Sequence, residues 1–245
     1  MGGLATASAL SLVVIVTAAL TGGSRAVLRT DTPGASRPSD GAATVAAFDH
    51  VRIEGGIQTS LRQGSTFSVR VRASDRARSQ VSVRVSRGVL YVVRHYQPGP
   101  QDVVTVDIST PTLANLELAG GPHVQLLGFI DQVARQVTMS GGAALSGQLS
   151  ASTLTLTGSG GVASTLAGTV RHLTTSGSGG SSFRLEQVAC EDATISLTGA
   201  SSLDLGPVGS VSSASVNGAS TLSLAPGTRI DSRNVDTSST IRYRR

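Results

Sequence analysis

The sequence predicts an all-β fold, a parallel β-helix or solenoid of roughly 20-residue coils. Three observations carry this prediction. Aromatic residues are 3% of the 245-residue chain and tryptophan is absent, whereas glycine supplies 29 residues without the three-residue period of collagen. Short alternating stretches rich in small and β-branched residues recur in the second half of the chain, and glycine follows each of them. Such side chains suit the narrow interior of stacked coils.

The chain begins with an uncharged apolar stretch, Leu4–Thr21. It predicts a signal peptide over residues 1–23 or, as the alternative, an uncleaved N-terminal membrane anchor. Residues 24–46 are rich in glycine, alanine, serine and proline, a composition typical of a flexible linker. We therefore expect an exported protein that meets a membrane only through the N-terminal segment, if that segment stays uncleaved.

Residues 47–112 form a strand-rich section that we expect to be continuous with the later repeats. Arg70 and Arg72 alternate with valines in one stretch, and Arg84 does so in another. We expect these three arginines to share an exposed face. Over residues 1–100 the chain carries 12 arginines and five acidic residues. This excess fits contact with an anionic polymer or a membrane surface; a solvated strand face is the simpler explanation, which we favour.

The repeat occupies residues 113–245. Each copy is a short alternating strand followed by a turn glycine, because glycine adopts the positive φ that a sharp turn needs. The glycines that we align are Gly120, Gly141, Gly158, Gly177, Gly199 and Gly218. Their intervals average about 20 residues, a period typical of solenoids. A degenerate seventh copy starts at Val235, with Thr237 in the glycine position.

Stacked copies should pair their backbones along the whole array and place equivalent side chains in columns. Serine and threonine hydroxyls in these columns can then form ladders. One repeat alone cannot bury its apolar side, so stability should depend on neighbouring coils.

The residues give no sign of catalysis, of a cofactor or of a metal site. Glu191 and Asp192 are adjacent in a strand and should therefore face opposite ways, unlike the paired carboxylates of glycosidases. The four histidines form no close pair, and the lone Cys190 fits a small buried side chain better than an intermolecular disulfide. Arginines interleaved with exposed aromatics, as nucleic-acid binding requires, are missing.

A family resemblance follows from the order of the segments. Phe48-Asp49-His50-Val51 opens the strand-rich section, and Pro111-Thr112-Leu113 leads into the repeats, whose best motifs are Gly199-Ala200-Ser201 and Gly218-Ala219-Ser220. Over about residues 48–243 the chain resembles the bacterial "putative auto-transporter adhesin, head GIN domain" family. The resemblance implies an exported β-helix-like fold and no established activity or functional residues.

Two functional hypotheses follow. The first is a non-catalytic module of the periplasm or the bacterial cell surface that acts as an adhesin or a scaffold towards an envelope, matrix or surface polymer. The second is a module that binds anionic envelope polymers through Arg70, Arg72 and Arg84. Oligomers could form through the solenoid edges or by side-by-side packing.

Overall fold

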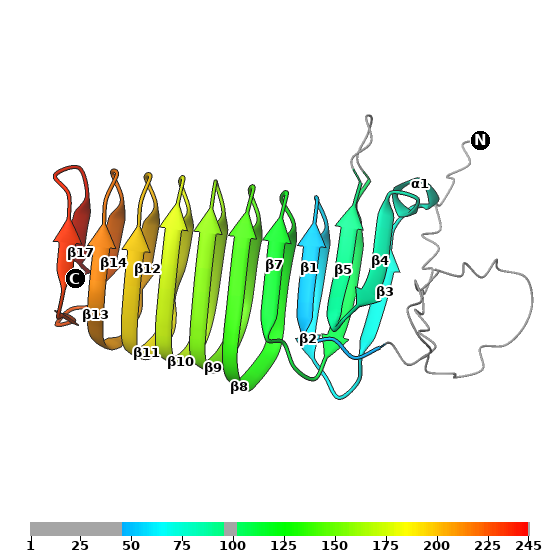
Figure 1. Cartoon of the computed structure of the whole chain (residues 1–245), viewed down its shortest axis with the longest axis horizontal. Helices are drawn as coiled ribbons and strands as arrows, with labels where there is room; N and C mark the ends of the chain where they lie inside the picture. Colours follow the sequence, from blue (N-terminus) through cyan, green and yellow to red (C-terminus); the bar gives the residue numbers. More distant parts are fainter. Residues whose placement is uncertain (1–45, 96–101, 245) are drawn as a thin grey trace, which may run out of the picture.

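The computed structural model describes residues 46–95 and 102–244, except for the side chains of residues 131–134. The predicted signal peptide or anchor and nearly all of the predicted linker lie outside this part. Within it, no helix has the length and apolar character needed to cross a membrane. The all-β solenoid is confirmed: about six turns over residues 115–243 form a straight rod (Figure 1).

The strand-rich section contains one short helix, α1 (Asp75–Arg78), whose N-terminus is capped by the Ser74 hydroxyl. Its strands are β1 (His50–Glu54), β2 (Gln58–Gln63), β3 (Ser68–Arg72), β4 (Val81–Ser86), β5 (Val89–Arg94) and β6 (Thr105–Thr110). The strands of the repeat section are β7 (Asn115–Ala119), β8 (His123–Ser140), β9 (Ala144–Ser159), β10 (Ala163–Ser178), β11 (Ser182–Leu197), β12 (Ser202–Leu205), β13 (Val208–Val216), β14 (Thr221–Leu224), β15 (Arg229–Ile230), β16 (Arg233–Val235) and β17 (Thr240–Tyr243).

Parallel pairing builds two facing walls. Wall A, in front in Figure 1, contains β5, β1 and β7, then the second halves of β8 to β11, β13 and β16. Wall B contains β6 and β2, the first halves of β8 to β11, then β12, β14 and β17. The long strands belong to both walls because each bends round one side of the rod, while a tight corner joins the walls on the other side.

Antiparallel strands close the end of the rod where the described chain begins. β3 pairs with β6 and so extends wall B, whereas β4 pairs with β5 and extends wall A. The helix α1 connects β3 to β4 (Figure 1). Val71, Ala77 and Val83 are buried beneath this cap, which continues the apolar core of the coils.

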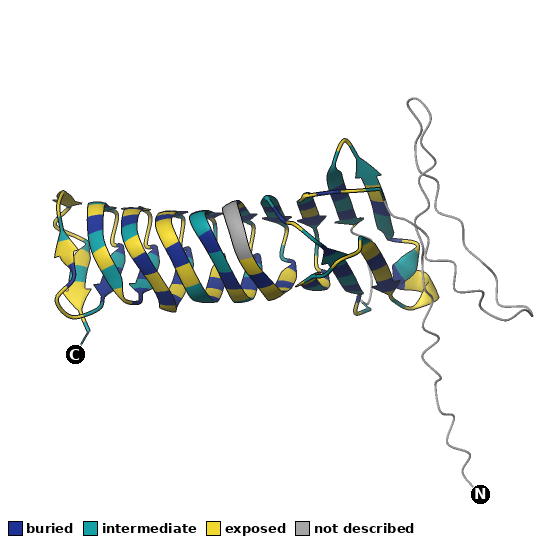
Figure 2. Ribbon diagram, turned by 90° about the horizontal axis from the view of Figure 1, so that it is seen from below, coloured by how far each residue is buried: buried dark blue, intermediate teal, exposed yellow. Residues whose placement is uncertain are grey.

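The core follows the two-residue period of the strands, so buried and exposed residues alternate along each coil (Figure 2). Leucine, valine and isoleucine fill most inward columns, for example Leu116, Val137 and Leu156 on wall A. Each coil buries its apolar side against the next, as the repeat pattern predicts.

The corner glycines form one column, but two of the six aligned positions are corrected by the structure. Gly120, Gly141, Gly199 and Gly218 occupy the corner with φ between 65° and 72°. In the two coils between Gly141 and Gly199 the corner residues are Gly160 and Gly179. Gly158 pairs with Met139 and Gly177 pairs with Leu197, so both belong to strands.

Gly158 and Gly177 are required for packing instead. A Cβ atom on either residue would lie 2.7 Å from the ring of Phe183, which is fully buried on β11. The missing side chains of the two glycines therefore make the space that this ring fills. Ser164, which pairs with Phe183 on wall B, also has a small side chain in this inward column.

The last coil replaces the glycine corner with polar side chains. Val235 pairs with Val216, so Thr237 lies level with Gly218. The Asp236 carboxylate accepts a hydrogen bond of 2.7 Å from the Gly218 amide, and the Ser238 and Ser239 hydroxyls accept bonds from the next two amides. These side chains accept hydrogen bonds from the corner amides of Gly218, Ala219 and Ser220, which a further glycine corner would otherwise shield from water.

Alanine at Gly199 should destabilise the protein. Its Cβ would lie 2.9 Å from the Gly179 nitrogen, and φ of +66° strains any L-residue. We expect a loss of about 2 kcal/mol, measured by urea unfolding. Gly161→Ala is the matched control, because its Cβ would meet no atom within 4 Å. Equal losses in the two variants would contradict the corner column.

The polar cap of the last coil should depend on pH. Hydrogen bonds from the Ser239 hydroxyl and the Gly218 amide lower the pKa of Asp236 to about 2. An unfolded aspartate has a pKa of about 3.9. The stabilisation that ionised Asp236 gives the folded state is therefore complete above that pH and is lost as the pH falls through about 2. Hydrogen exchange of the Gly218 amide should be slower in wild type than in Asp236→Asn at pH 5. The difference between the two rates should shrink as the pH falls through about 2 and vanish below it; a constant difference would refute the assignment.

Candidate functional site

The three arginines predicted to share a face do not do so. Arg70 and Arg72 lie on β3 at the end of wall B, whereas Arg84 lies on β4 at the end of wall A. Arg72 forms an ion pair of 2.9 Å with Asp107, and the Arg84 guanidinium lies 4.0 Å from the centre of the Tyr91 ring. Alternation shows which side of a strand a residue takes, but not the wall to which the strand belongs.

The outer surface of wall A carries an ordered array of hydroxyl groups. Parallel pairing in register aligns outward residues from β8 to β13 in two columns. Successive members of a column are about 4.8 Å apart, and the two columns are about 6.7 Å apart. We call the following residues the hydroxyl wall: Thr138, Thr155, Thr157, Thr174, Ser176, Thr194, Ser196 and Ser213.

The hydroxyl wall is open for binding. All its side chains are exposed or half-exposed. Within the described part of the chain, none of their hydroxyls takes part in a hydrogen bond, so the ladders expected from the sequence do not form here. In the column next to the corner the hydroxyls are used internally: that of Ser178 donates to the Gly158 carbonyl and that of Thr198 to the Gly177 carbonyl. The two outer columns therefore keep their full capacity for a ligand.

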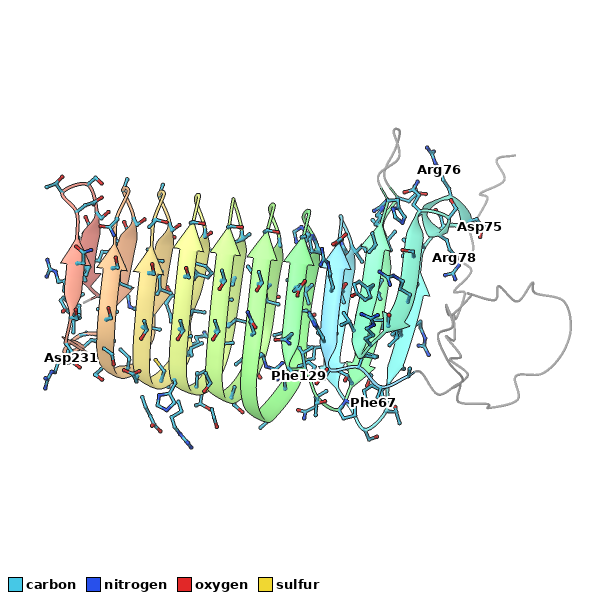
Figure 3. All side chains as sticks on the ribbon, viewed as in Figure 1. Phe67, Asp75, Arg76, Arg78, Phe129 and Asp231 are labelled. Atoms are coloured by element: carbon cyan, nitrogen blue, oxygen red, sulfur yellow. The ribbon has the colours of Figure 1, made fainter. Side chains whose placement is uncertain are left out.

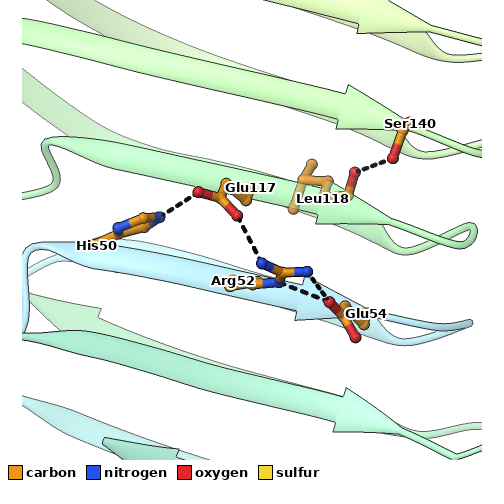
Figure 4. A network of polar contacts seen from close by, with 6 residues as sticks. All are labelled: His50, Arg52, Glu54, Glu117, Leu118 and Ser140. Atoms are coloured by element: carbon orange, nitrogen blue, oxygen red, sulfur yellow. Dashed lines mark hydrogen bonds and ion pairs between the residues drawn. The ribbon is translucent and has the colours of Figure 1, made fainter. Parts of the chain in front are cut away.

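Charged residues lie outside the hydroxyl wall. On wall A one cluster lies at the N-terminal end, where His50 Nε2 lies 2.9 Å from a Glu117 oxygen and Arg52 bridges Glu54 and Glu117 (Figure 4). The hydrogen bond to Glu54 raises the pKa of Arg52. In this network one arginine contacts both carboxylates. His172 and Asp192 occupy the outward column beside Thr174 and Thr194, and Arg233 lies on β16.

Wall B differs, because Arg184, Asp204 and Arg242 stand among its outward residues. The hydroxyl wall itself thus contains no charged side chain, although Asp192 adjoins it.

The thiol and the adjacent acidic pair noted in the sequence lie in different surroundings. Burial, followed by the charge of Asp192, raises the pKa of the Cys190 thiol to about 11, so it stays protonated at neutral pH. Glu191 is exposed beside Arg171, whereas Asp192 accepts a hydrogen bond from Ser212. No group of three histidine, cysteine or acidic residues in residues 46–95 and 102–244 is placed to hold a metal ion.

Arg135 is an exception in the core. It occupies the column of Leu154 and Leu173 and is 2% exposed, with its guanidinium 4.8 Å from the centre of the Phe129 ring. None of its side-chain nitrogens has a hydrogen-bond partner among the described residues. Burial lowers the pKa of Arg135 to about 10. The folded state therefore bears the cost of an unpaired buried charge.

Leucine in place of Arg135 should stabilise the fold. It matches the neighbouring column and removes the buried charge, so we expect a gain of about 1–3 kcal/mol at pH 7 in urea unfolding. Arg171→Leu, at an exposed site, is the control and should change stability by less than about 0.5 kcal/mol. A loss of stability in Arg135→Leu would show that the guanidinium has a partner that stabilises the fold.

Sequence reasoning anticipated stacked hydroxyl columns but did not identify the wall that carries them. The available signal is the alternation of threonine and serine immediately before each corner, as in Thr155-Leu156-Thr157 and Thr194-Ile195-Ser196. The serine of the Gly-Ala-Ser motif is structural: Ser201 and Ser220 are buried, and each donates to the carbonyl three residues earlier.

Comparison with known proteins agrees with the fold. A "putative adhesin" from Bacteroides fragilis has a TM-score of 0.72 and 16% identity, and a "putative lipid binding protein" from Parabacteroides distasonis has a TM-score of 0.63 and 11% identity. A "putative adhesin" from Parabacteroides merdae has a TM-score of 0.58 and 16% identity. Each alignment covers 82% of this chain and 94% of the other. No match is found among curated protein sequences. The family model "Putative auto-transporter adhesin, head GIN domain" matches residues 47–225, and the chain belongs to this family.

Proposed function

We propose that this chain is an exported, non-catalytic adhesive module of the bacterial cell envelope that binds a neutral polysaccharide on its hydroxyl wall. The observation that carries the proposal is the array itself: eight hydroxyl side chains in register, without charge and without internal hydrogen bonds. The adhesin-type family and the apolar stretch Leu4–Thr21 support export.

The chemistry of the wall favours a repetitive ligand. One hydroxyl bond contributes only about 0.5–1.5 kcal/mol net, which is too little for specific adhesion. Equivalent hydroxyls at about 4.8 Å intervals can contact a polymer many times, so weak bonds add up. Each hydroxyl both donates and accepts, as sugar hydroxyls do. A neutral polysaccharide matches these properties, whereas an anionic polymer would gain no charge interaction here.

The test replaces hydroxyls with methyl groups of the same shape. In Thr157→Val/Thr174→Val/Thr194→Val, binding to insoluble neutral polysaccharides such as cellulose, chitin and mannan should fall at least about 10-fold, because three hydroxyl contacts are lost. The matched control is Thr165→Val/Thr221→Val/Thr240→Val on wall B, which should bind as wild type does. Depletion of protein from solution over a polysaccharide series measures both.

The effect of salt separates the two functional hypotheses. Binding through neutral hydroxyls should change little between 0.1 and 0.5 M NaCl, since screening acts on charges. Affinity lost equally in both triple variants, or binding confined to anionic polymers, would overturn the proposal. Release of soluble oligosaccharides from any polysaccharide would show that the chain is an enzyme.

A further inference from the structure

The end of the rod formed by β3, α1 and β4 is strongly basic. Residues 68–88, which build this end, contain one acidic residue, Asp75. We call the arginines of this segment the basic cap: Arg70, Arg72, Arg76, Arg78, Arg84 and Arg87. Figure 3 shows Arg76 and Arg78 on α1, at the extreme end of the rod. The cap therefore concentrates positive charge around this end of the rod.

Most of this charge is not neutralised. Arg72 is paired with Asp107, and Arg84 rests on an aromatic ring that carries no charge. Within residues 46–95 and 102–244, no carboxylate forms an ion pair with Arg70, Arg76 or Arg87, and all three are exposed. An exposed surplus of this size attracts anionic surfaces.

The opposite end of the rod uses its arginines differently. Arg229 pairs with Asp231 at 2.7 Å, Arg244 lies 3.7 Å from Glu186, and Arg242 donates to the Ser223 hydroxyl. Arg233 is exposed and forms no ion pair with a described residue. Charged residues on both ends protect open strand edges against pairing with other chains. Edge protection alone does not explain why one end keeps a much larger unpaired surplus.

The chain also enters the rod at the basic cap. Phe48, shortly before β1, packs against Phe67 at the start of β3, with ring centres 5.3 Å apart. The apolar stretch Leu4–Thr21 lies 24 residues before the first described residue, Ala46. The apolar stretch is therefore joined to the rod at the end that carries the basic cap.

We propose that the basic cap docks on an anionic lipid surface. Phosphate groups of lipids would pair with Arg76 and Arg87, and with Arg70, whose cross-strand neighbour Asp107 is paired with Arg72. In this orientation the rod stands away from the membrane, and the hydroxyl wall remains accessible along its length. The inference is independent of the polysaccharide proposal, because it uses other residues and another partner.

The experiment measures binding of the full chain to vesicles by co-sedimentation. Vesicles of phosphatidylcholine alone are compared with vesicles that contain 30 mol% phosphatidylglycerol. Each arginine near an anionic surface strengthens binding about 5-fold, so Arg70→Gln/Arg76→Gln/Arg87→Gln should bind the anionic vesicles about 100-fold more weakly than wild type. Wild-type binding should also fall steeply between 0.1 and 0.5 M NaCl. The apolar stretch is present in every variant and adds equally to all of them.

Arg171→Gln/Arg184→Gln/Arg233→Gln is the control, since it removes the same charge from exposed sites elsewhere. It should reduce binding by no more than about 2-fold. Equal wild-type binding to the two vesicle types, or equal losses in the two triple variants, overturns the proposal. Binding to soluble polyglycerol phosphate but not to vesicles would assign the cap to an anionic polymer instead. If the cap variant fails to fold, the lipid and salt dependence of wild type still decides.

Discussion

The structure depends on close contact between successive corners. At each corner the chain turns with positive φ, and the next corner lies so near that a Cβ on Gly199 or Gly218 would meet the backbone nitrogen of the coil before it at 2.8–2.9 Å. The contact sets the register of the coils. Because a one-residue slip would exchange inward and outward side chains, the same contact keeps leucines inside and aligns the hydroxyls of wall A in columns.

The sequence was sufficient to predict the coils, their period and the family, because glycine recurs after alternating strands. It was not sufficient to choose between two glycines in Gly158-Ser159-Gly160 and Gly177-Ser178-Gly179. Alignment on the Ser-Gly pairs at Ser140, Ser159 and Ser178 would have found the corners. The size of Phe183, which occupies the space over the earlier glycines, explains why those positions are glycine as well.

The functional surfaces were harder to predict than the fold. Strand alternation correctly placed Arg70, Arg72 and Arg84 on outer sides, yet their strands pair antiparallel at the ends of different walls. The pairing of β3 with β6 is decided by tertiary contacts across residues 68–110, which leave no local pattern, whereas β4 and β5 form a hairpin through the two-residue turn Arg87-Gly88. The burial of Arg135 is likewise a tertiary effect, because it follows from the register of β8 with β9. The residues next to Arg135 in the sequence do not predict it.

The packing of Phe183 against Gly158 and Gly177 limits how this rod can change its length in evolution. Solenoids lengthen and shorten by gain and loss of whole coils, and most junctions tolerate this because neighbouring coils present similar surfaces. The ring of Phe183 fills space left by Gly158 and Gly177, which belong to two earlier coils. A coil inserted between Gly177 and Phe183 would leave a void on one side and a clash on the other. These three coils must therefore be inherited as a block, whereas length can vary elsewhere along the array.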